Sequence, residues 1–325
     1  MCTAVTMNMG DTYFGRTLDY EISHGEQVTF MPRNFPLSFR HGKILTNHYA
    51  IEGMACVAEG YPLYFDAFNE KGLAMAGLNF VGYAKYHAPV EGKNNVASFE
   101  LIPWILAQCA TVQEAKELLD RINLTADAFS ETLPPAQLHW MIGDSQETIV
   151  VESTSAGLKV YSNPVGVVTN NPEFEDQLFL LNNYMHLSPR DPENSFSPDL
   201  DLKRYSRGMG ALGLPGDLSS QSRFVRAAFT KLNARCPEGE GEAVNQFFHV
   251  MEVVSQTDGC CQVGQGQFEK TLYTSCCNTT KGIYYYTTYF NRRISGVVMG
   301  RENLDGKELK QFPLQEKPEL QILNG

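Results

Sequence analysis

The chain has 325 residues, of which 43% are hydrophobic and 19% are charged, a balance typical of a globular enzyme. Its formal net charge of −11 at pH 7 argues against nucleic-acid binding, because phosphates require a basic surface. No apolar run approaches the ~20 residues that span a bilayer, and residues 1–16 lack a basic segment followed by an apolar one. We therefore expect a cytoplasmic protein that binds neither nucleic acid nor membranes.

The first 80 residues predict β-strands. Short segments rich in Thr, Val, Phe and Tyr are separated by Gly and Asp, the pattern of strands joined by turns. Cys2 would then lie on a strand inside a sheet, which fixes its side chain more firmly than a free terminus could. The predicted strands are 2–8, 13–19, 27–32, 49–59 and 72–80.

The middle of the chain predicts two helices and two β-hairpins. Apolar residues recur at helical spacing over 98–109, and Thr111 with Glu114 has the capping-box pattern that begins a second helix. Alternating segments separated by short polar turns follow, as in hairpins. The predicted hairpins pair 137–142 with 147–153, and 158–161 with 165–169.

The last third predicts three more helices and a final group of strands. A third helix follows Pro172, a fourth covers 219–232 and a fifth covers 243–254. Strands follow at 271–276, 282–289 and 294–299, the first two paired across a turn that begins at Asn278. The fourth helix should turn four apolar side chains to the core: Val225, Ala228, Phe229 and Leu232.

This order segregates strands from helices instead of alternating them, which favours an α+β fold over a doubly wound parallel sheet. We predict one domain over 2–325, with four αββα layers in which two antiparallel sheets lie between helices. Residues 187–216 are rich in Pro and Gly and predict no regular element. A loop of this length in a compact enzyme has a function or is disordered, and clasping a neighbouring subunit is one such function.

Eight cysteines are too few for a disulfide scaffold in a chain of this length, so we expect most to be reduced and buried. Neighbouring cysteines on a strand point to opposite faces, whereas zinc sites use spaced pairs. No His-x-x-x-His or His-Glu-x-x-His pattern occurs either. We predict no metal and no cofactor. The cysteines are residues 2, 56, 109, 236, 260, 261, 276 and 277.

Cys2 directly follows the initiator methionine. Removal of Met1 would leave one residue that carries both a thiol and a free α-amine. The thiolate could attack an acyl carbon while the amine takes and returns the proton, as in N-terminal nucleophile hydrolases. Position alone favours the other interpretation, that Cys2 is simply a small residue at the start of a strand.

Five separated motifs, in order, resemble the choloylglycine hydrolase family, and within it the bile salt hydrolases of gut bacteria. The resemblance covers residues 1–300 and implies the N-terminal nucleophile fold, a homotetramer in which 187–216 clasps a neighbour, and hydrolysis of the amide between a bile acid and glycine or taurine. The motifs are Met1 to Ala4, Phe14 to Tyr20, Gly72 to Phe80, Thr169 to Pro172 and Gly213 to Phe224.

The resemblance also implies roles for individual residues. Cys2 would be the nucleophile and its α-amine the base. Arg16 on the adjacent predicted strand would stabilise the thiolate, and Asp19 would hold the α-amine by hydrogen bonding.

Two asparagines and a second arginine complete this set. Asn79 and Asn170 match the oxyanion and substrate-orienting residues, since neutral amides donate hydrogen bonds without titrating. Asn170 is preferred to Asn171 because the residue after the matching asparagine varies in the family. Arg223 matches the family arginine, whereas Arg226 should be solvated or bridging.

The substrate pocket is predicted with less support from the motifs. A steroid requires apolar walls, for which we select Leu18, Tyr20, Phe65 and Phe80. Asn79 favours bile salts over penicillin V, because penicillin V acylases of the family tend to carry an aromatic residue there. Three alternatives stay open: a penicillin V acylase, a transferase in which an amine intercepts the acyl-thioester, and a non-catalytic bile-acid-binding protein.

Overall fold

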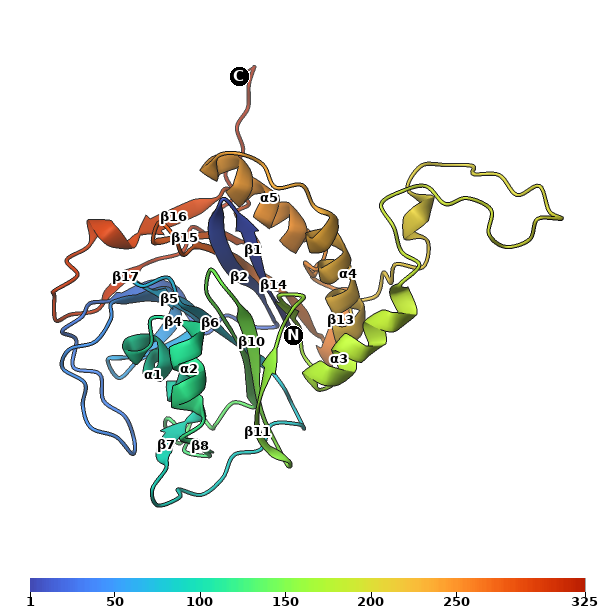
Figure 1. Cartoon of the computed structure of the whole chain (residues 1–325). Helices are drawn as coiled ribbons and strands as arrows, with labels where there is room; N and C mark the ends of the chain where they lie inside the picture. Colours follow the sequence, from blue (N-terminus) through green and yellow to red (C-terminus); the bar gives the residue numbers. More distant parts are fainter. Residues whose placement is uncertain (325) are drawn as a thin grey trace.

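The computed structural model describes residues 1–324 and contains two large antiparallel sheets (Figure 1). The first sheet has the strand order β12-β1-β2-β14-β15-β16, with β13 paired to β14. Its strands are β1 (Cys2–Met9), β2 (Asp11–Tyr20), β12 (Val167–Val168), β13 (Cys261–Gly264), β14 (Gln267–Asn278), β15 (Ile283–Thr288) and β16 (Ser295–Val298).

The second sheet has the order β11-β10-β9-β6-β5-β4-β3-β17. A separate parallel pair joins β7 (Asn94–Ala97) to β8 (Ile122–Thr125). The strands of the second sheet are β3 (Gln27–Met31), β4 (Ile51–Ala58), β5 (Tyr61–Asn69), β6 (Ala74–Asn79), β9 (Leu138–Gly143), β10 (Thr148–Thr154), β11 (Gly157–Ser162) and β17 (Lys310–Phe312).

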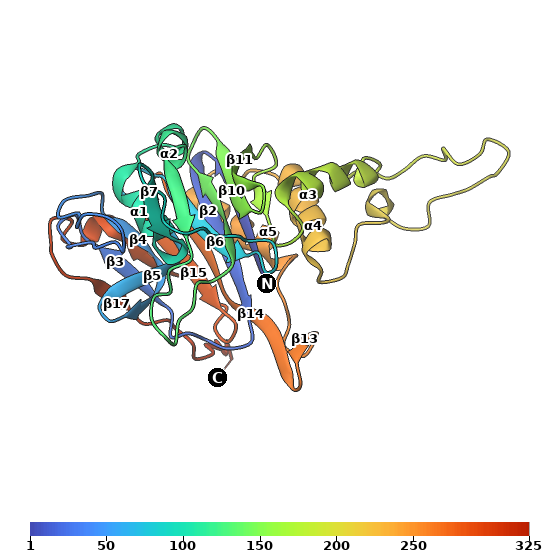
Figure 2. The same ribbon diagram turned by 90° about the horizontal axis from the view of Figure 1, so that it is seen from below.

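Helices cover the outer faces of both sheets, which confirms the predicted four-layer αββα architecture (Figures 1 and 2). Helix α1 packs on β5 and β6, and the helices of the opposite layer, α4 and α5, pack on β1 and β14. The helices are α1 (Leu101–Gln108), α2 (Val112–Leu119), α3 (Phe174–Leu180), α4 (Ser220–Asn233) and α5 (Glu240–Glu252), with short 3₁₀ turns η1 (Ser98–Glu100), η2 (Leu181–Tyr184), η3 (Met209–Ala211) and η4 (Met299–Arg301).

Strands β1 and β2 are buried on both faces because helices lie on one side and the second sheet on the other. Their register places Cys2 opposite Leu18 and Ala4 opposite Arg16. Alternate residues of a strand point to opposite faces. Cys2 and Arg16 therefore face the second sheet, while Thr17 and Asp19 face the helices.

The second predicted hairpin is wrong. Strand β11 pairs with β10 in the second sheet, whereas β12 pairs with β1 in the first, with Ala4 opposite Val168. Between them the chain crosses from one sheet to the other through a turn in which the Asn163 side-chain amide donates to the Val167 carbonyl. Strand propensity identified both segments, but local pattern could not assign them to different sheets.

The predicted core face of the fourth helix is also partly wrong. Leu232 is exposed, and Phe224 and Ala227 are buried in its place. The buried face of the helix therefore differs from the predicted apolar face, since it also contains the polar residues Arg223 and Arg226.

All eight cysteines are free, but only half are buried, fewer than expected. Cys236 and Cys260 are exposed, while Cys276 and Cys277 lie side by side in the interior of β14. Among residues 1–324 no group of three His, Cys, Asp or Glu side chains could hold a metal ion. In the same residues no helix is long and apolar enough to cross a membrane. The cytoplasmic location stays a prediction.

Glu52 on β4 makes stability depend on pH. Its side chain is fully buried, neither carboxylate oxygen has a hydrogen-bond partner within residues 1–324, and burial together with the charge of Glu302 raises its pKa from 4.5 to about 8. Between these values the folded chain holds a proton that the unfolded chain releases. The contribution of Glu52 to stability is therefore lost as the pH rises from about 4.5 to about 8.

We expect Glu52→Gln to remove this loss. The free energy of unfolding of the variant should gain on that of the parent by up to about 1.4 kcal/mol per pH unit in this interval. Urea unfolding of both proteins at pH 5, 6.5 and 8 measures the difference. A difference that stays constant with pH would contradict the assignment.

Candidate active site

Cys2 and Arg16 form a direct contact between the first two strands. The Cys2 side chain is 2% exposed, and Nη2 of Arg16 donates to its Sγ at 2.6 Å. Nη1 of the same guanidinium crosses to the second sheet, where it donates to the carbonyls of Phe65 at 3.1 Å and Gly77 at 2.5 Å. Arg16 is thus held by both sheets with one N–H group directed at the sulfur.

The charge of Arg16 is maintained by its surroundings. Burial by itself would lower the pKa of Arg16, but the ionisable groups around it, Cys2 first and then Tyr273, Asp66 and Asp19, outweigh this and raise it. Within residues 1–324 no carboxylate forms a salt bridge with the guanidinium. Among these residues, the Cys2 sulfur is the side-chain acceptor that this cation contacts, and its other acceptors are backbone carbonyls.

Asn170 and Arg223 hold the backbone of Cys2. Oδ1 of Asn170 accepts from the Cys2 backbone N–H at 2.9 Å and from Nη2 of Arg223 at 2.6 Å. Nη1 of Arg223 donates to the Cys2 carbonyl and to Thr3 Oγ1. Asn171 points elsewhere, and its amide donates to the Val81 carbonyl. The structure thus brings Asn170, and not Asn171, to the nucleophile.

Asn79 ends β6 beside this group. Its backbone carbonyl accepts from Nδ2 of Asn170 at 2.8 Å. Its own side-chain amide is partly exposed and has no hydrogen-bond partner among the described residues. Two amide hydrogens are therefore available for a group that enters from solvent.

Asp19 lies on the helix side of β2 and does not reach the Cys2 nitrogen in this chain. Its buried carboxylate accepts from Thr271 Oγ1 at 2.6 Å, Thr17 Oγ1 at 3.1 Å and the Gln256 amide at 3.4 Å. The Met1 amine instead binds the Asp19 carbonyl, at 2.6 Å, and Glu269 Oε1, at 2.8 Å. A bond from Asp19 to the α-amine stays a prediction for the chain without Met1.

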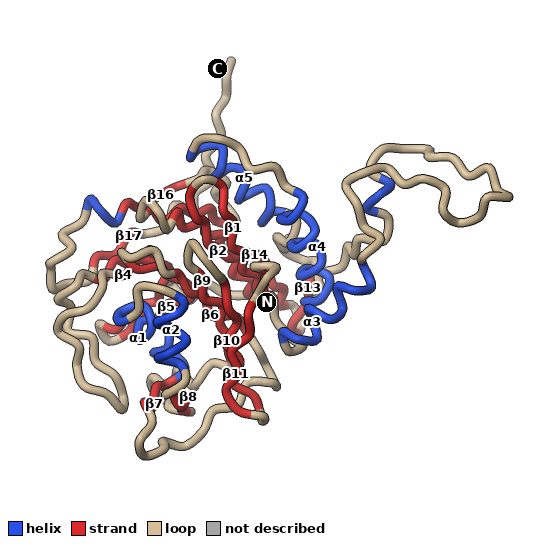
Figure 3. The backbone as a smooth tube through the Cα atoms, viewed as in Figure 1, coloured by secondary structure: helices blue, strands red, loops and turns tan. Residues whose placement is uncertain are grey.

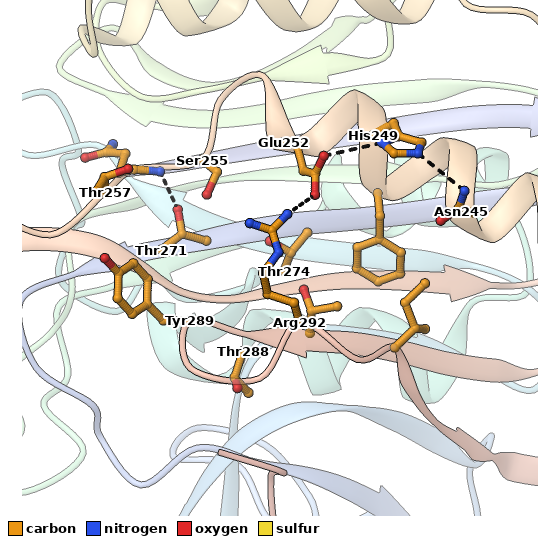
Figure 4. A pocket seen from close by; sticks show the side chains of 14 residues that line it. Asn245, His249, Glu252, Ser255, Thr257, Thr271, Thr274, Thr288, Tyr289 and Arg292 are labelled. Carbon is orange, nitrogen blue, oxygen red and sulfur yellow. Dashed lines mark hydrogen bonds and ion pairs between the residues drawn. The ribbon is translucent and has the colours of Figure 1, made fainter. Parts of the chain in front are cut away.

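A polar cavity of about 640 Å³ lies between α5 and strands β14 and β15 (Figure 4). Thr271 and Gln256 belong to its wall, and both also hold the Asp19 carboxylate. Cys2 is not among the lining residues. The cavity therefore lies behind Asp19, outside the contacts that surround the thiol.

The four predicted pocket residues differ in exposure. Tyr20 and Phe65 are partly exposed, and His24 lies between them with ring centroids 5.1 Å and 6.1 Å away. Leu18 is buried opposite Cys2. Phe80 has no exposed surface and stacks on His139, so its prediction as a pocket wall is wrong. No motif identified His24, because its only signal is this aromatic contact between two strands.

Arg226 is neither solvated nor part of the site. It is buried and donates to the carbonyls of Val253, Pro215 and Asp217, which ties α4 to the segments on either side. It bridges backbone segments, one of the two roles expected from the sequence. Its loss would disturb packing, so it does not serve as a neutral comparison for Arg16.

The fold has four layers, and the thiol of the second residue, Cys2, is buried in contact with an arginine. These features define an amide hydrolase with an N-terminal cysteine nucleophile. Residues 2–312 match the family described as linear amide C-N hydrolases, choloylglycine hydrolase family, and the chain belongs to that family.

The similar proteins carry consistent names. The chain is 53% identical over 324 residues to the bile salt hydrolase/transferase of Lactiplantibacillus plantarum, covering 100% of both chains. It is 38% identical to the bile salt hydrolase/transferase of Clostridium perfringens, covering 96% of each. A mutant conjugated bile acid hydrolase from Clostridium perfringens superposes with a TM-score of 0.92 at 37% identity over 100% of both chains. Penicillin V acylase from Agrobacterium tumefaciens, at 20% identity and a TM-score of 0.77 over 97% of this chain and 92% of that one, shares the fold.

Proposed function

We propose that this enzyme hydrolyses the amide bond of glycine- or taurine-conjugated bile acids, with Cys2 as nucleophile after removal of Met1. The contact between Arg16 and the Cys2 sulfur carries the proposal, because it directs a fixed cation at a thiolate. The names of the relatives support the substrate class, and the partly exposed Tyr20 and Phe65 offer apolar surface for a steroid.

The reaction proceeds in two steps. The α-amine takes the proton of the Cys2 thiol, and the resulting thiolate attacks the amide carbonyl. The C–N bond breaks as the protonated amine delivers that proton to the departing glycine or taurine nitrogen. Water then attacks the resulting thioester and gives its proton to the amine. The C–S bond breaks, and the bile acid leaves as a carboxylic acid.

The surrounding residues have separate tasks in these steps. Asn170 Oδ1 orients the nitrogen of Cys2, which becomes the base. The unpartnered amide of Asn79 and the second amide hydrogen of Asn170, whose first is donated to the Asn79 carbonyl, donate to the oxyanion of each tetrahedral intermediate. Arg223 fixes the Cys2 carbonyl, and burial lowers the pKa of this arginine from its ordinary value. Asp19 holds the freed amine.

A panel of substrates tests the proposal. We expect release of glycine and taurine from conjugated bile acids to exceed cleavage of penicillin V, measured as free amine per active site. Faster cleavage of penicillin V would favour the acylase. The proposed reaction would be rejected if the protein bound bile acids without releasing amine, and if a variant lacking the Cys2 thiol bound them equally well.

The same assay examines a second activity. Several relatives, including the two described above, are named hydrolase/transferase, and a thioester can react with a neutral amine as well as with water. With an excess of labelled amino acid, new conjugates should therefore increase with pH and amine concentration. If free bile acid is the only product under all conditions, the transferase activity is rejected and hydrolysis is the only activity.

We infer that residues 2–325 act as one domain and assemble into a homotetramer through residues 187–216. This segment projects from the body of the chain as a long loop (Figure 3). It carries Phe196 and Tyr205 with exposed fractions of 83% and 81%. Aromatic surface of this kind, lacking contacts in one chain, supports burial against another copy.

Deletion of residues 190–212 should weaken assembly more than folding. The deleted residues contain only the 3₁₀ turn η3 and none of the strands or α-helices, so little of the body is disturbed. Size-exclusion chromatography should show smaller particles with an unchanged far-UV spectrum. Leu323→Ser, which alters an exposed apolar residue near the C-terminus, provides the control. A deletion variant that still elutes as a tetramer would reject the clasp.

A further inference from the structure

A buried histidine and glutamate lie directly behind the two asparagines of the site. His139 on β9 and Glu152 on β10 have no exposed surface. Nδ1 of His139 lies 2.9 Å from Oε1 of Glu152, and its Nε2 lies 2.9 Å from the carbonyl oxygen of Thr169. The proposed reaction gives neither side chain a role.

Hydrogen-bonding chemistry fixes the orientation of this histidine. A carbonyl oxygen only accepts, so Nε2 must donate to Thr169. The bond to Glu152 then requires one proton, carried either by Nδ1 or by the carboxyl group. The imidazole ring also stacks on Phe80, with centroids 4.3 Å apart and planes 4° apart. Two in-plane bonds and one stacked face leave the ring no alternative orientation.

His139 contacts two residues that are sequence neighbours of the asparagines of the site. Thr169, whose carbonyl His139 binds, precedes Asn170, and Phe80, on which it stacks, follows Asn79. Within the sheet His139 is the partner of Leu78, which precedes Asn79. The asparagines in turn contact each other through Nδ2 of Asn170 and the Asn79 carbonyl.

Glu152 extends the same support to the far end of the segment that carries Asn170. Its carboxylate accepts from the backbone N–H of Phe174 at 3.1 Å, where α3 begins. Residues 169–174 are therefore held at one end by His139 and at the other by Glu152. A buried pair whose groups are all satisfied is rigid, and loss of one member leaves the other unpaired.

We propose that His139 and Glu152 are positioning residues that set the separation of Asn79 and Asn170 for oxyanion binding. The inference rests on the proposed amide hydrolysis, but not on the identity of the acyl group. A small displacement of an oxyanion donor lowers transition-state stabilisation more than substrate binding. The pair should therefore govern kcat, with little effect on KM or on the reactivity of the thiol.

Two amide substitutions separate the contacts of His139. The amide nitrogen of glutamine can take the place of Nε2, so His139→Gln keeps the donor to Thr169. The shorter asparagine can replace only Nδ1, so His139→Asn keeps the contact with Glu152 and loses Thr169. Both variants carry a neutral amide in the same buried position.

His48 supplies the matched control. It is also buried, and its two ring nitrogens lie 2.8 Å and 2.9 Å from the carbonyls of Tyr49 and Phe35. A neutral ring donates its one N–H to one of these two carbonyls. His48 therefore also anchors backbone, but it does so between loop segments outside the site. His48→Asn should lower the melting temperature without changing kcat.

The measurements are kcat and KM per alkylatable Cys2, using the amide that the parent enzyme cleaves fastest. We expect His139→Asn to lower kcat by about 10- to 100-fold with KM and the alkylation rate of Cys2 within about 3-fold of the parent. His139→Gln should recover most of kcat, and Glu152→Gln should show an intermediate loss.

The proposal is overturned if His139→Asn retains the parent kcat, if Gln and Asn at position 139 have equal effects, or if His48→Asn lowers kcat as much. A parent enzyme that cleaves another amide but no conjugated bile acid would reject the proposed substrate. The ranking of the His139 variants on that other amide would still decide this inference.

Discussion

Cys2→Ala should abolish amide hydrolysis while the chain still folds. Removal of the nucleophile from a serine protease lowers kcat by a factor on the order of 10⁶, and a loss of this size is expected here because no other thiol contacts Arg16 among the described residues. The chain should still fold because alanine lacks only the sulfur atom of the cysteine side chain. Amine release measures activity, and near-UV circular dichroism measures folding. Cys260→Ala, which alters an exposed cysteine, should be silent.

The same experiment can separate the thiol from the amine. A chain with one alanine inserted before Cys2 keeps the thiol and its contact with Arg16 but converts the α-amine into a peptide N–H, which cannot act as a base. It should be as inactive as Cys2→Ala, although its thiol should still react with iodoacetamide. Intact mass should show that Met1 is absent from the active parent. Full activity of a chain that retains Met1 would reject the amine as the base.

Sequence pattern predicted the parts of the site that depend on neighbouring strands. The strands around Cys2 and Arg16 were recognisable from their composition, and the turn between them is too short to allow another pairing. Their antiparallel register then places the arginine diagonally across from the cysteine, two positions from the Leu18 that pairs with it. The motifs supplied the distant members, Asn170 and Arg223, which no local rule could have brought to Cys2.

The parts that pattern did not predict depend on polar groups satisfied from far away in the chain. Strand β5 was not predicted, and its interior holds Asp66, an unfavourable residue for a buried strand. In the structure this carboxylate accepts from the hydroxyls of Tyr273, Ser275 and Tyr284 on the other sheet. The pKa of Asp66 is still raised by burial, which outweighs Arg16 and these bonds.

The contact between Phe80 and His139 was also not predictable from sequence pattern. An aromatic residue beside Asn79 is a reasonable pocket wall by type, and a histidine outside every motif gives no signal. Only the pairing of β6 with β9 reveals that the two rings stack on each other in the interior. Burial on both faces of a sheet removes the alternation that would have distinguished wall from core.

Asn170→Ala should lower kcat by about 10² to 10³, the cost of removing one oxyanion donor from a protease. The substitution also removes the acceptor that orients the Cys2 nitrogen and leaves Nη2 of Arg223 without this partner in a buried position. Asn171→Ala is the matched control, because the same change at the next residue removes only a bond to the Val81 carbonyl. Asn171→Ala should lower kcat by several-fold at most.

Asn170→Asp distinguishes the two duties of this side chain. A carboxylate keeps the acceptor for the Cys2 nitrogen and for Arg223, but it loses the amide donor and adds a negative charge beside the amine. That charge favours the protonated amine, which cannot act as a base. We therefore expect activity to fall with retained folding, and to recover in part as the pH is raised and the amine is deprotonated. A loss that is equal at every pH would assign Asn170 to donation alone, and a larger effect of Asn171→Ala would show that the wrong asparagine had been placed beside the nucleophile.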